Sequence, residues 1–117
     1  MRILTLEDDP QRHVKFRENL SGAHLLIVEK VEDAIAKLKD ESWDWLFLDH
    51  DLGGQQMVDS SDPTTGYWVA KWLEENPDRQ PGNIIIHTCN TPGAKNMLTC
   101  LPDAQYVPFA WMKVAYK

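Results

Sequence analysis

The most informative stretch for the fold is Trp45-Leu46-Phe47-Leu48-Asp49-His50-Asp51-Leu52-Gly53-Gly54. In it an apolar run ends abruptly in three ionisable side chains. An almost wholly apolar run is typical of a central strand that is buried on both faces of a parallel sheet. Residues 3–9 (ILTLEDD) and 84–90 (IIIHTCN) have the same form. Ligands of open α/β sheets bind outside the carboxyl ends of the strands. We therefore expect one site at that edge, with the candidate residues Glu7, Asp8, Asp49, His50, Asp51, His87, Thr88 and Asn90.

Strand and helix patterns alternate along the chain, which predicts an α/β fold with a parallel sheet covered by helices on both faces. Asp9-Pro10 and Thr91-Pro92 each combine a capping residue with a proline at the first helical turn, so a helix is expected to begin at each. Pro108 indicates that the last strand lies at a sheet edge. We expect strands at about residues 2–7, 24–28, 43–48, 83–87 and 105–111, and helices at about residues 10–20, 31–40, 65–76 and 91–101.

The composition is that of one ordinary globular domain spanning residues 1–117. A net charge of −6 argues against duplex DNA as a partner, because non-specific affinity for nucleic acid comes from Lys and Arg. No apolar run approaches the roughly 20 residues of a membrane span. The N-terminus lacks signal-peptide anatomy, and Cys89 and Cys100 have no metal-binding spacing. We therefore expect a cytoplasmic protein with reduced cysteines and no membrane association.

The element order and the acidic residues resemble the receiver domains of two-component response regulators. The segment from Arg2 to Pro10 (RILTLEDDP) looks very like that family's first strand and acidic corner. The resemblance implies a flavodoxin-like three-layer sandwich with strand order 2-1-3-4-5. It also implies that Glu7 and Asp8 bind metal, that Asp49 accepts a phosphoryl group and that Thr88 is the switch hydroxyl. On the same alignment Asp51 is the residue whose backbone carbonyl reaches the metal.

The chain departs from ordinary receivers in features that are similar to a smaller family, the cyclic-phosphate-processing receivers. The matching motifs are Leu48-Asp49-His50-Asp51-Leu52-Gly53, Thr65-Gly66-Tyr67 and His87-Thr88-Cys89-Asn90, followed by Gly93-Ala94 and Asn96-Met97. The expected Lys-Pro of the fifth strand is absent, with no lysine after Phe109 until Lys113, and the last helix is expected to be missing. The resemblance implies action on a cyclic phosphate carried by a nucleotide or an RNA end.

The residue types suit metal-assisted opening of such a phosphate. Mg²⁺ or Mn²⁺ prefers carboxylate oxygens, which predicts the metal ligands Glu7, Asp8, Asp49 and Asp51. His50 and His87 are candidates to move protons near neutral pH, because an ordinary imidazole has a pKa near 6.5. With Asp49 and Thr88 they form the predicted catalytic set. The helix start at Asn90, Thr91 and Gly93 offers backbone N–H groups as a phosphate cradle.

Several alternatives remain open at this level. His50 could fix a loop, His87 could hold the end of its strand, and Asn90 could cap a helix. Asp51 could orient a histidine, bind metal or cap the loop, and Arg12 could meet phosphate or form a salt bridge. Asp49 could instead be phosphorylated, as in a signalling receiver. A third interpretation is a non-catalytic pseudo-receiver that binds a partner, with a homodimer formed through the flank that lacks the last helix.

Overall fold

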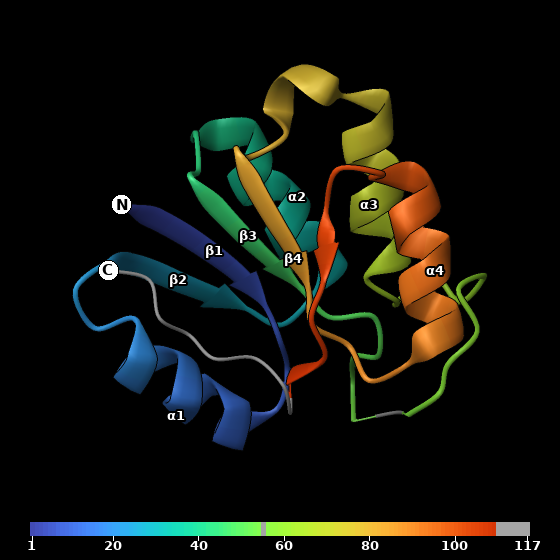
Figure 1. The fold of residues 1–117 in the computed structure, drawn as a ribbon, viewed down its shortest axis with the longest axis horizontal. Helices are drawn as coiled ribbons and strands as arrows, with labels where there is room; N and C mark the ends of the chain where they lie inside the picture. The colour runs from blue at the N-terminus through green and yellow to red at the C-terminus, as the bar shows by residue number, and fades with distance from the viewer. Residues whose placement is uncertain (55, 110–117) are drawn as a thin grey trace.

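The computed structural model describes residues 1–54 and 56–109, which form a sheet with helices on both of its faces (Figure 1). The five strands are parallel and run in the order β2-β1-β3-β4-β5, which confirms the predicted order. Their bounds are β1 (Arg2–Leu6), β2 (His24–Val28), β3 (Trp45–Leu48), β4 (Asn83–Ile86) and β5 (Gln105–Tyr106).

The register aligns the carboxyl ends of the three central strands. Leu6 of β1 lies opposite Leu48 of β3, which in turn lies opposite Ile86 of β4. The residues that follow these three partners therefore lie side by side at the same sheet edge. Successive residues of a strand point to opposite faces, so this register also decides which strand-end side chains share a face.

Two apolar cores hold the three layers together. The helix α1 (Pro10–Asn19) covers one face, where Phe16 packs edge-on against Phe47 with ring centroids 5.3 Å apart. The helices α2 (Val31–Asp40), α3 (Tyr67–Glu75) and α4 (Thr91–Cys100) cover the other face and enclose the larger core. The arrangement is the three-layer receiver fold that the sequence predicts (Figure 1).

Side-chain caps begin the two helices that flank the sheet edge. The Asp9 carboxylate accepts a hydrogen bond from the Gln11 backbone N–H, and Pro10 follows in the first turn of α1. The Asn90 amide oxygen accepts from the Gly93 N–H at the start of α4. These contacts satisfy N–H groups that a helix terminus otherwise leaves unpaired, which is why both helices start directly after a strand end.

The last predicted strand is too long. β5 has only the residues Gln105 and Tyr106, although beyond it the N–H groups of Val107 and Phe109 still donate to the carbonyls of Ile86 and His87. It lies at the sheet edge, as Pro108 indicated, and Trp111 lies outside the described residues. The expected absence of a last helix concerns residues 110–117, which also lie outside the described part. Within that part no helix is long and apolar enough to cross a membrane.

Candidate functional site

Glu7, Asp49 and His87 meet at the sheet edge, directly after β1, β3 and β4. One ligand atom from each lies within 4.8 Å of the others. The three residues are almost fully buried, with exposed fractions of 1% for Glu7, 4% for Asp49 and 0% for His87. Because each follows one of the three aligned partners, the strand register alone brings them together on the α1 side of the sheet.

Glu7 is held as a carboxylate by several donors. Its Oε1 lies 2.9 Å from His87 Nε2 and 3.4 Å from an Arg12 guanidinium nitrogen. Its Oε2 accepts hydrogen bonds of 3.1 Å from the backbone N–H groups of Asp8 and Asp9. Burial opposes ionisation, but the hydrogen bond and charge of His87, the backbone donors and Arg12 together lower the pKa of Glu7 to about 2.

The pKa of Asp49 is shifted in the opposite direction to that of Glu7. Its Oδ1 accepts from the His50 backbone N–H at 2.8 Å, and its Oδ2 lies 3.8 Å from Arg12. Burial raises the pKa of Asp49 to about 7; the charge of His87 opposes this rise, and the charge of Glu7 adds to it. Two neighbouring carboxyl groups thus differ widely in their readiness to carry a proton.

His87 lies beneath the cleft floor in an aromatic cage. The ring centroids of Phe16, Phe109 and Phe47 lie 5.4, 6.3 and 6.5 Å from that of His87. Its Nε2 faces Glu7, whereas its buried Nδ1 has no hydrogen-bond partner among the described residues. His87 therefore reaches the cleft only through Glu7.

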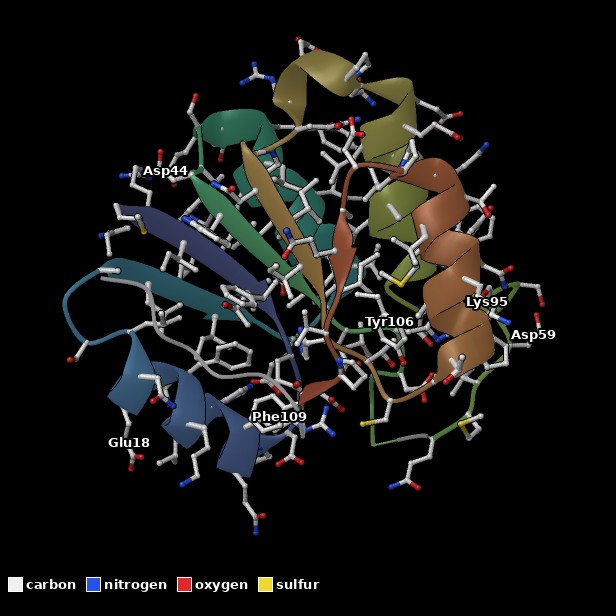
Figure 2. The ribbon with its side chains drawn as sticks, in the orientation of Figure 1. Glu18, Asp44, Asp59, Lys95, Tyr106 and Phe109 are labelled. Atoms are coloured by element: carbon white, nitrogen blue, oxygen red, sulfur yellow. The ribbon has the colours of Figure 1, made fainter. Side chains whose placement is uncertain are left out.

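A cleft of ≈ 530 Å³ opens above these residues. Arg12 is the one lysine or arginine among its described lining residues, and its guanidinium lies 4.8 Å from the ring centroid of Phe109. Figure 2 places Phe109 beside the first turns of α1. The acidic and polar lining residues are Glu7, Asp8, Asp9, Asp49, Asp51, Gln56, Thr88 and Asn90, and Pro10, Gly54, Met57 and Cys89 complete the lining.

Asp8 and Thr88 complete the cleft wall. The Asp8 Oδ2 accepts a hydrogen bond of 2.7 Å from the Gly54 N–H, which ties the loop after β3 to the end of β1. The Thr88 side chain is buried, and its Oγ1 accepts from the Asn90 N–H at 3.1 Å. Of the predicted catalytic set, Asp49 and Thr88 line the cleft.

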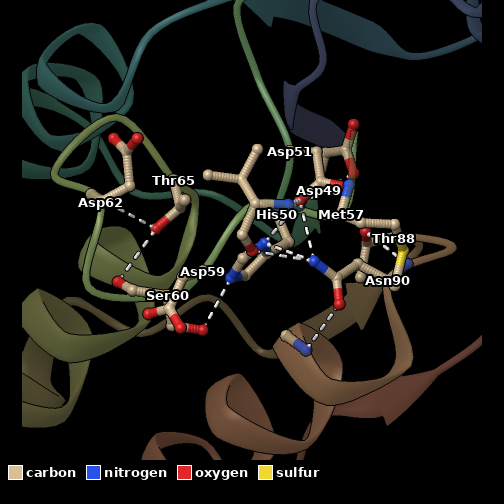
Figure 3. Close-up of polar contacts among 12 residues, drawn as sticks. Asp49, His50, Asp51, Met57, Asp59, Ser60, Asp62, Thr65, Thr88 and Asn90 are labelled. Atoms are coloured by element: carbon tan, nitrogen blue, oxygen red, sulfur yellow. Dashed lines mark hydrogen bonds and ion pairs between the residues drawn. The ribbon is translucent and has the colours of Figure 1, made fainter. Parts of the chain in front are cut away.

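His50 lies on the other face of the sheet from Asp49, beneath α4 (Figure 3). Its ring is fully buried, with Nδ1 2.8 Å from Asp51 Oδ1 and Nε2 2.8 Å from Ser60 Oγ. The ring is not part of the cleft lining. It packs against Gly93, where an added Cβ would come within 2.6 Å of the imidazole.

The Asp51 side chain organises the loop. Its Oδ2 accepts from the Met57 N–H at 2.7 Å, and its Oδ1 accepts from Asn90 Nδ2 at 3.0 Å as well as facing His50. Burial opposes ionisation, but the bonds from His50, Asn90 and the loop backbone lower the pKa of Asp51. Its oxygens are thus occupied within the loop rather than turned toward Glu7 and Asp49.

The expected phosphate cradle is differently arranged. The Gly93 N–H is donated to the Asn90 cap, and Thr91 is exposed and does not line the cleft. Asn90 Nδ2 also donates to the Val58 carbonyl at 3.0 Å, so its amide joins α4 to the loop after β3 (Figure 3). Asn90 caps the helix and also lines the cleft.

Two residues make more contacts with the candidate site residues than the sequence indicated. Arg12 was considered for either phosphate or a salt bridge, and it faces the cleft while pairing with Glu7 and Asp49. Ser60 was not considered, because a serine in a polar loop gives no signal of a histidine partner ten residues away.

The fold and this edge of the sheet define a receiver-like protein. A sequence model described as the cyclic-phosphate processing receiver domain matches residues 2–103, so the chain belongs to that family. A search of curated proteins found no match.

Solved structures of receivers share the fold. The receiver domain of a sensor histidine kinase from Pseudomonas aeruginosa, with magnesium in its active-site cleft, is 20% identical with a TM-score of 0.74, covering 97% of this chain and 87% of that one. The response regulator TrrA from Thermotoga maritima, in complex with Mg²⁺ and BeF, is 23% identical with a TM-score of 0.69, covering 92% and 84%. The Mn²⁺-bound response regulator Rcp1 is 18% identical with a TM-score of 0.69, covering 91% and 78%.

Proposed function

We propose that the cleft hydrolyses a cyclic phosphate carried by a nucleotide or an RNA end, with the help of a divalent metal. The carrying observation is the buried Glu7–Asp49–His87 group beneath a cleft whose described lining contains a single cation, Arg12. The membership of a family described by cyclic-phosphate processing supports the same substrate class. Proton carriers and a phosphate-binding cation thus lie within one small volume.

Arg12 binds the non-bridging phosphate oxygens in this proposal. Its side chain is 25% exposed, and its guanidinium stacks on Phe109 and lies 3.4 and 3.8 Å from oxygens of Glu7 and Asp49. These separations are loose for a charge-assisted bond, and a planar guanidinium matches two phosphate oxygens better. At the cleft wall the buried Thr88 Oγ1 accepts from the Asn90 N–H, so its own hydrogen can be donated to a phosphate oxygen.

The donor set fits Mg²⁺ or Mn²⁺. Glu7 and Asp49 are ionisable carboxyl groups held against each other in a buried place, and Asp8 adds a third carboxylate on the cleft wall. Hard cations of this kind prefer such oxygens. Receivers of the same fold that hold magnesium or manganese support the assignment. When bound, the cation would polarise the phosphoryl group or lower the pKa of a bound water.

The protein groups supply the proton transfers. Asp49 takes a proton from the attacking water as the new O–P bond forms, which suits a carboxyl group poised near neutral pH. The ribose oxygen that leaves phosphorus takes the proton that Asp49 received, whereas Glu7 stays ionised and is held in place by His87 Nε2 behind it. The product is a phosphate monoester. His50 has no part in this reaction, because its ring faces α4.

The test is phosphorus NMR of the protein with a nucleoside 2′,3′-cyclic phosphate and Mg²⁺. We expect the cyclic-diester resonance to be replaced by a monoester resonance. Asp49→Asn should slow this conversion by about 100-fold or more, the usual scale for a lost general acid or base. Asp40→Asn, at the exposed end of α2, is the matched control and should retain the wild-type rate. An unchanged spectrum with the wild-type protein would contradict the proposal.

A second candidate function is phosphorylation of Asp49. The observation in its favour is the Asp49 Oδ2, which lies on the cleft wall with Arg12 at 3.8 Å, where it could attack a phosphoryl donor. Acetyl phosphate with Mg²⁺ should then add one phosphoryl group, detected as a mass increase that Asp49→Asn abolishes. Binding of the cyclic nucleotide without turnover or phosphorylation would instead favour a pseudo-receiver that only binds its ligand.

A further inference from the structure

A second group of chemically active side chains extends from Asp51, at the cleft wall, to the α4 side of the sheet. Ser60 Oγ is 2.8 Å from His50 Nε2, and His50 Nδ1 is 2.8 Å from Asp51 Oδ1 (Figure 3). A hydroxyl, an imidazole and a carboxylate in this order are the parts of an activated nucleophile: the base removes the hydroxyl proton and the carboxylate orients the base.

The surrounding hydrogen bonds favour one tautomer of His50. Asp51 accepts backbone N–H groups from Met57 and Val58 at 2.7 and 3.3 Å, so it is an acceptor. His50 Nδ1 lies closer to this acceptor (2.8 Å) than to the Asn90 amide nitrogen (3.3 Å), which favours a hydrogen on Nδ1. A neutral imidazole then has an acceptor lone pair on Nε2. Asn96 Nδ2 donates to Ser60 Oγ at 2.8 Å, as its amide is oriented. With this tautomer the Ser60 hydroxyl donates to His50 Nε2 at 2.8 Å, which is the arrangement needed for proton removal.

Ser60 faces a pocket distinct from the cleft. This pocket has a volume of ≈ 480 Å³ and lies between the loop and the helices α3 and α4, and its lining includes Tyr67, Trp68 and Asn96. Its described charged residues are Lys71 and Glu74, which pair at 2.9 Å and leave no net charge. A small uncharged substrate with an aromatic or short aliphatic part suits this surface better than a phosphate.

We propose that Ser60 is a nucleophile activated by His50 and that this second pocket hydrolyses small, uncharged carboxylic esters. Ser60 Oγ bonds to the ester carbonyl carbon while its proton moves to His50 Nε2. The ester C–O bond then breaks, and His50 returns the proton to the leaving oxygen. Water attacks the acyl-Ser60 in the same way, releasing the carboxylic acid and restoring the hydroxyl. Asp51 is a positioning residue, and Asn96 Nδ2, 2.8 Å from Ser60 Oγ, lies near enough to donate to the ester carbonyl oxygen as that oxygen gains negative charge.

The first experiment labels the native protein with an alkyl fluorophosphonate in EDTA, so that the metal-dependent cleft has no part in the result. We expect one adduct, located by mass spectrometry on the peptide that contains Ser60, and no adduct in the urea-unfolded protein. Ser60→Ala should abolish it. Ser21→Ala is the control and should label at the wild-type rate, because Ser21 is an exposed serine after α1 that does not line this pocket.

The second experiment measures release of p-nitrophenol from p-nitrophenyl acetate. Asp51→Asn retains the size of the side chain but disturbs the His50 tautomer, so it should slow the burst by about 100-fold or more. Thermal unfolding of each variant separates this loss from loss of the fold. Equal labelling of native and unfolded protein, or an adduct that persists in Ser60→Ala, would mean that the three side chains only latch the loop and would overturn the proposal.

Discussion

At the residue scale, the cleft places side by side two carboxyl groups whose pKa values are shifted in opposite directions. Glu7 is surrounded by donors and remains charged, whereas Asp49 is buried beside that charge. The ionised form of Asp49 is therefore held in the fold at a cost in free energy. Ionisable groups that are unfavourable for stability are common in active sites, because a shifted pKa is useful for catalysis even where it destabilises the fold.

Replacement of Asp49 by asparagine should stabilise the fold at high pH. The folded pKa of about 7 lies above the ordinary 3.8, so wild-type stability falls as pH rises from about 4 through 7. In EDTA at pH 8 we expect Asp49→Asn to raise the free energy of unfolding by on the order of 2 kcal/mol. The gain should vanish near pH 4 in urea unfolding curves. Glu7→Gln should act in the opposite direction and lose stability above pH 4.5, since the pKa of Glu7 is lowered. A pH-independent Asp49→Asn effect would contradict this account.

Replacement of Arg12 should weaken binding of a phosphate monoester, the expected product. Arg12→Gln removes the charge and should raise the dissociation constant for a nucleoside monophosphate about 10-fold, measured by calorimetry. Arg12→Lys keeps the charge without the planar fork and should recover part of the affinity. Arg17→Gln, an exposed change in the last turn of α1, is the control. Equal affinities for all three variants would remove Arg12 from the phosphate site.

At the element scale, two glycines let helices approach the active corner. Gly66 donates its N–H to the His50 carbonyl at 2.9 Å, and a Cβ there would overlap the Asp49 carbonyl oxygen. Gly93 likewise leaves room for the His50 ring beneath α4, because a Cβ there would come within 2.6 Å of the imidazole. The Thr65-Gly66 and Gly93-Ala94 motifs thus have a steric reason: α3 and α4 can begin against the backbone after β3 only without a side chain.

Gly66→Ala should therefore destabilise the fold by roughly 3 kcal/mol or more, because the obstacle is rigid backbone rather than a movable side chain. Thermal unfolding measures this. Gly22→Ala is the control, since an added Cβ there meets nothing within 4 Å, and its midpoint should stay near that of the wild type. A mild effect at Gly66 would mean that α3 is free to shift away from the Asp49 backbone.

The sequence predicted the elements better than it predicted the directions of their last side chains. Asp9 and Asn90 cap their helices through local hydrogen bonds, which a short stretch of sequence contains in full. Asp49 and His50 were expected in one site, but consecutive residues of an extended chain point to opposite faces. Once the register is known, the α1 side receives Glu7, Asp49 and His87, and His50 must face α4. Register depends on contacts some 40 residues apart, which no local pattern records.

At the scale of the whole molecule, an acidic chain places five of its 18 Asp and Glu side chains around one cleft at the sheet edge, where a divalent cation would relieve their repulsion. Mg²⁺ or Mn²⁺ should raise the thermal unfolding midpoint, and more at pH 8 than at pH 6, because Asp49 must release its proton to bind. Asp8→Asn and Asp49→Asn should lose the shift, whereas Asp40→Asn should keep it. A shift that all three variants retain would place the cation elsewhere.

The expected homodimer belongs to the same scale. The prediction depends on whether a last helix is present, and residues 110–117 lie outside the described part of the chain, so the dimer stays a prediction. Sedimentation velocity across a range of concentrations would measure it directly.

The aromatic cage around His87 has a spectroscopic consequence. Three phenyl rings at 5.4 to 6.5 Å should displace the imidazole carbon-bound proton resonances by ring currents, separating them from those of the other histidines. The hydrogen on Nε2, enclosed between the cage and Glu7, should exchange slowly with solvent and give its own far-downfield signal. A single buried side chain would then report, without any label, each arrival of ligand or cation in the cleft above it.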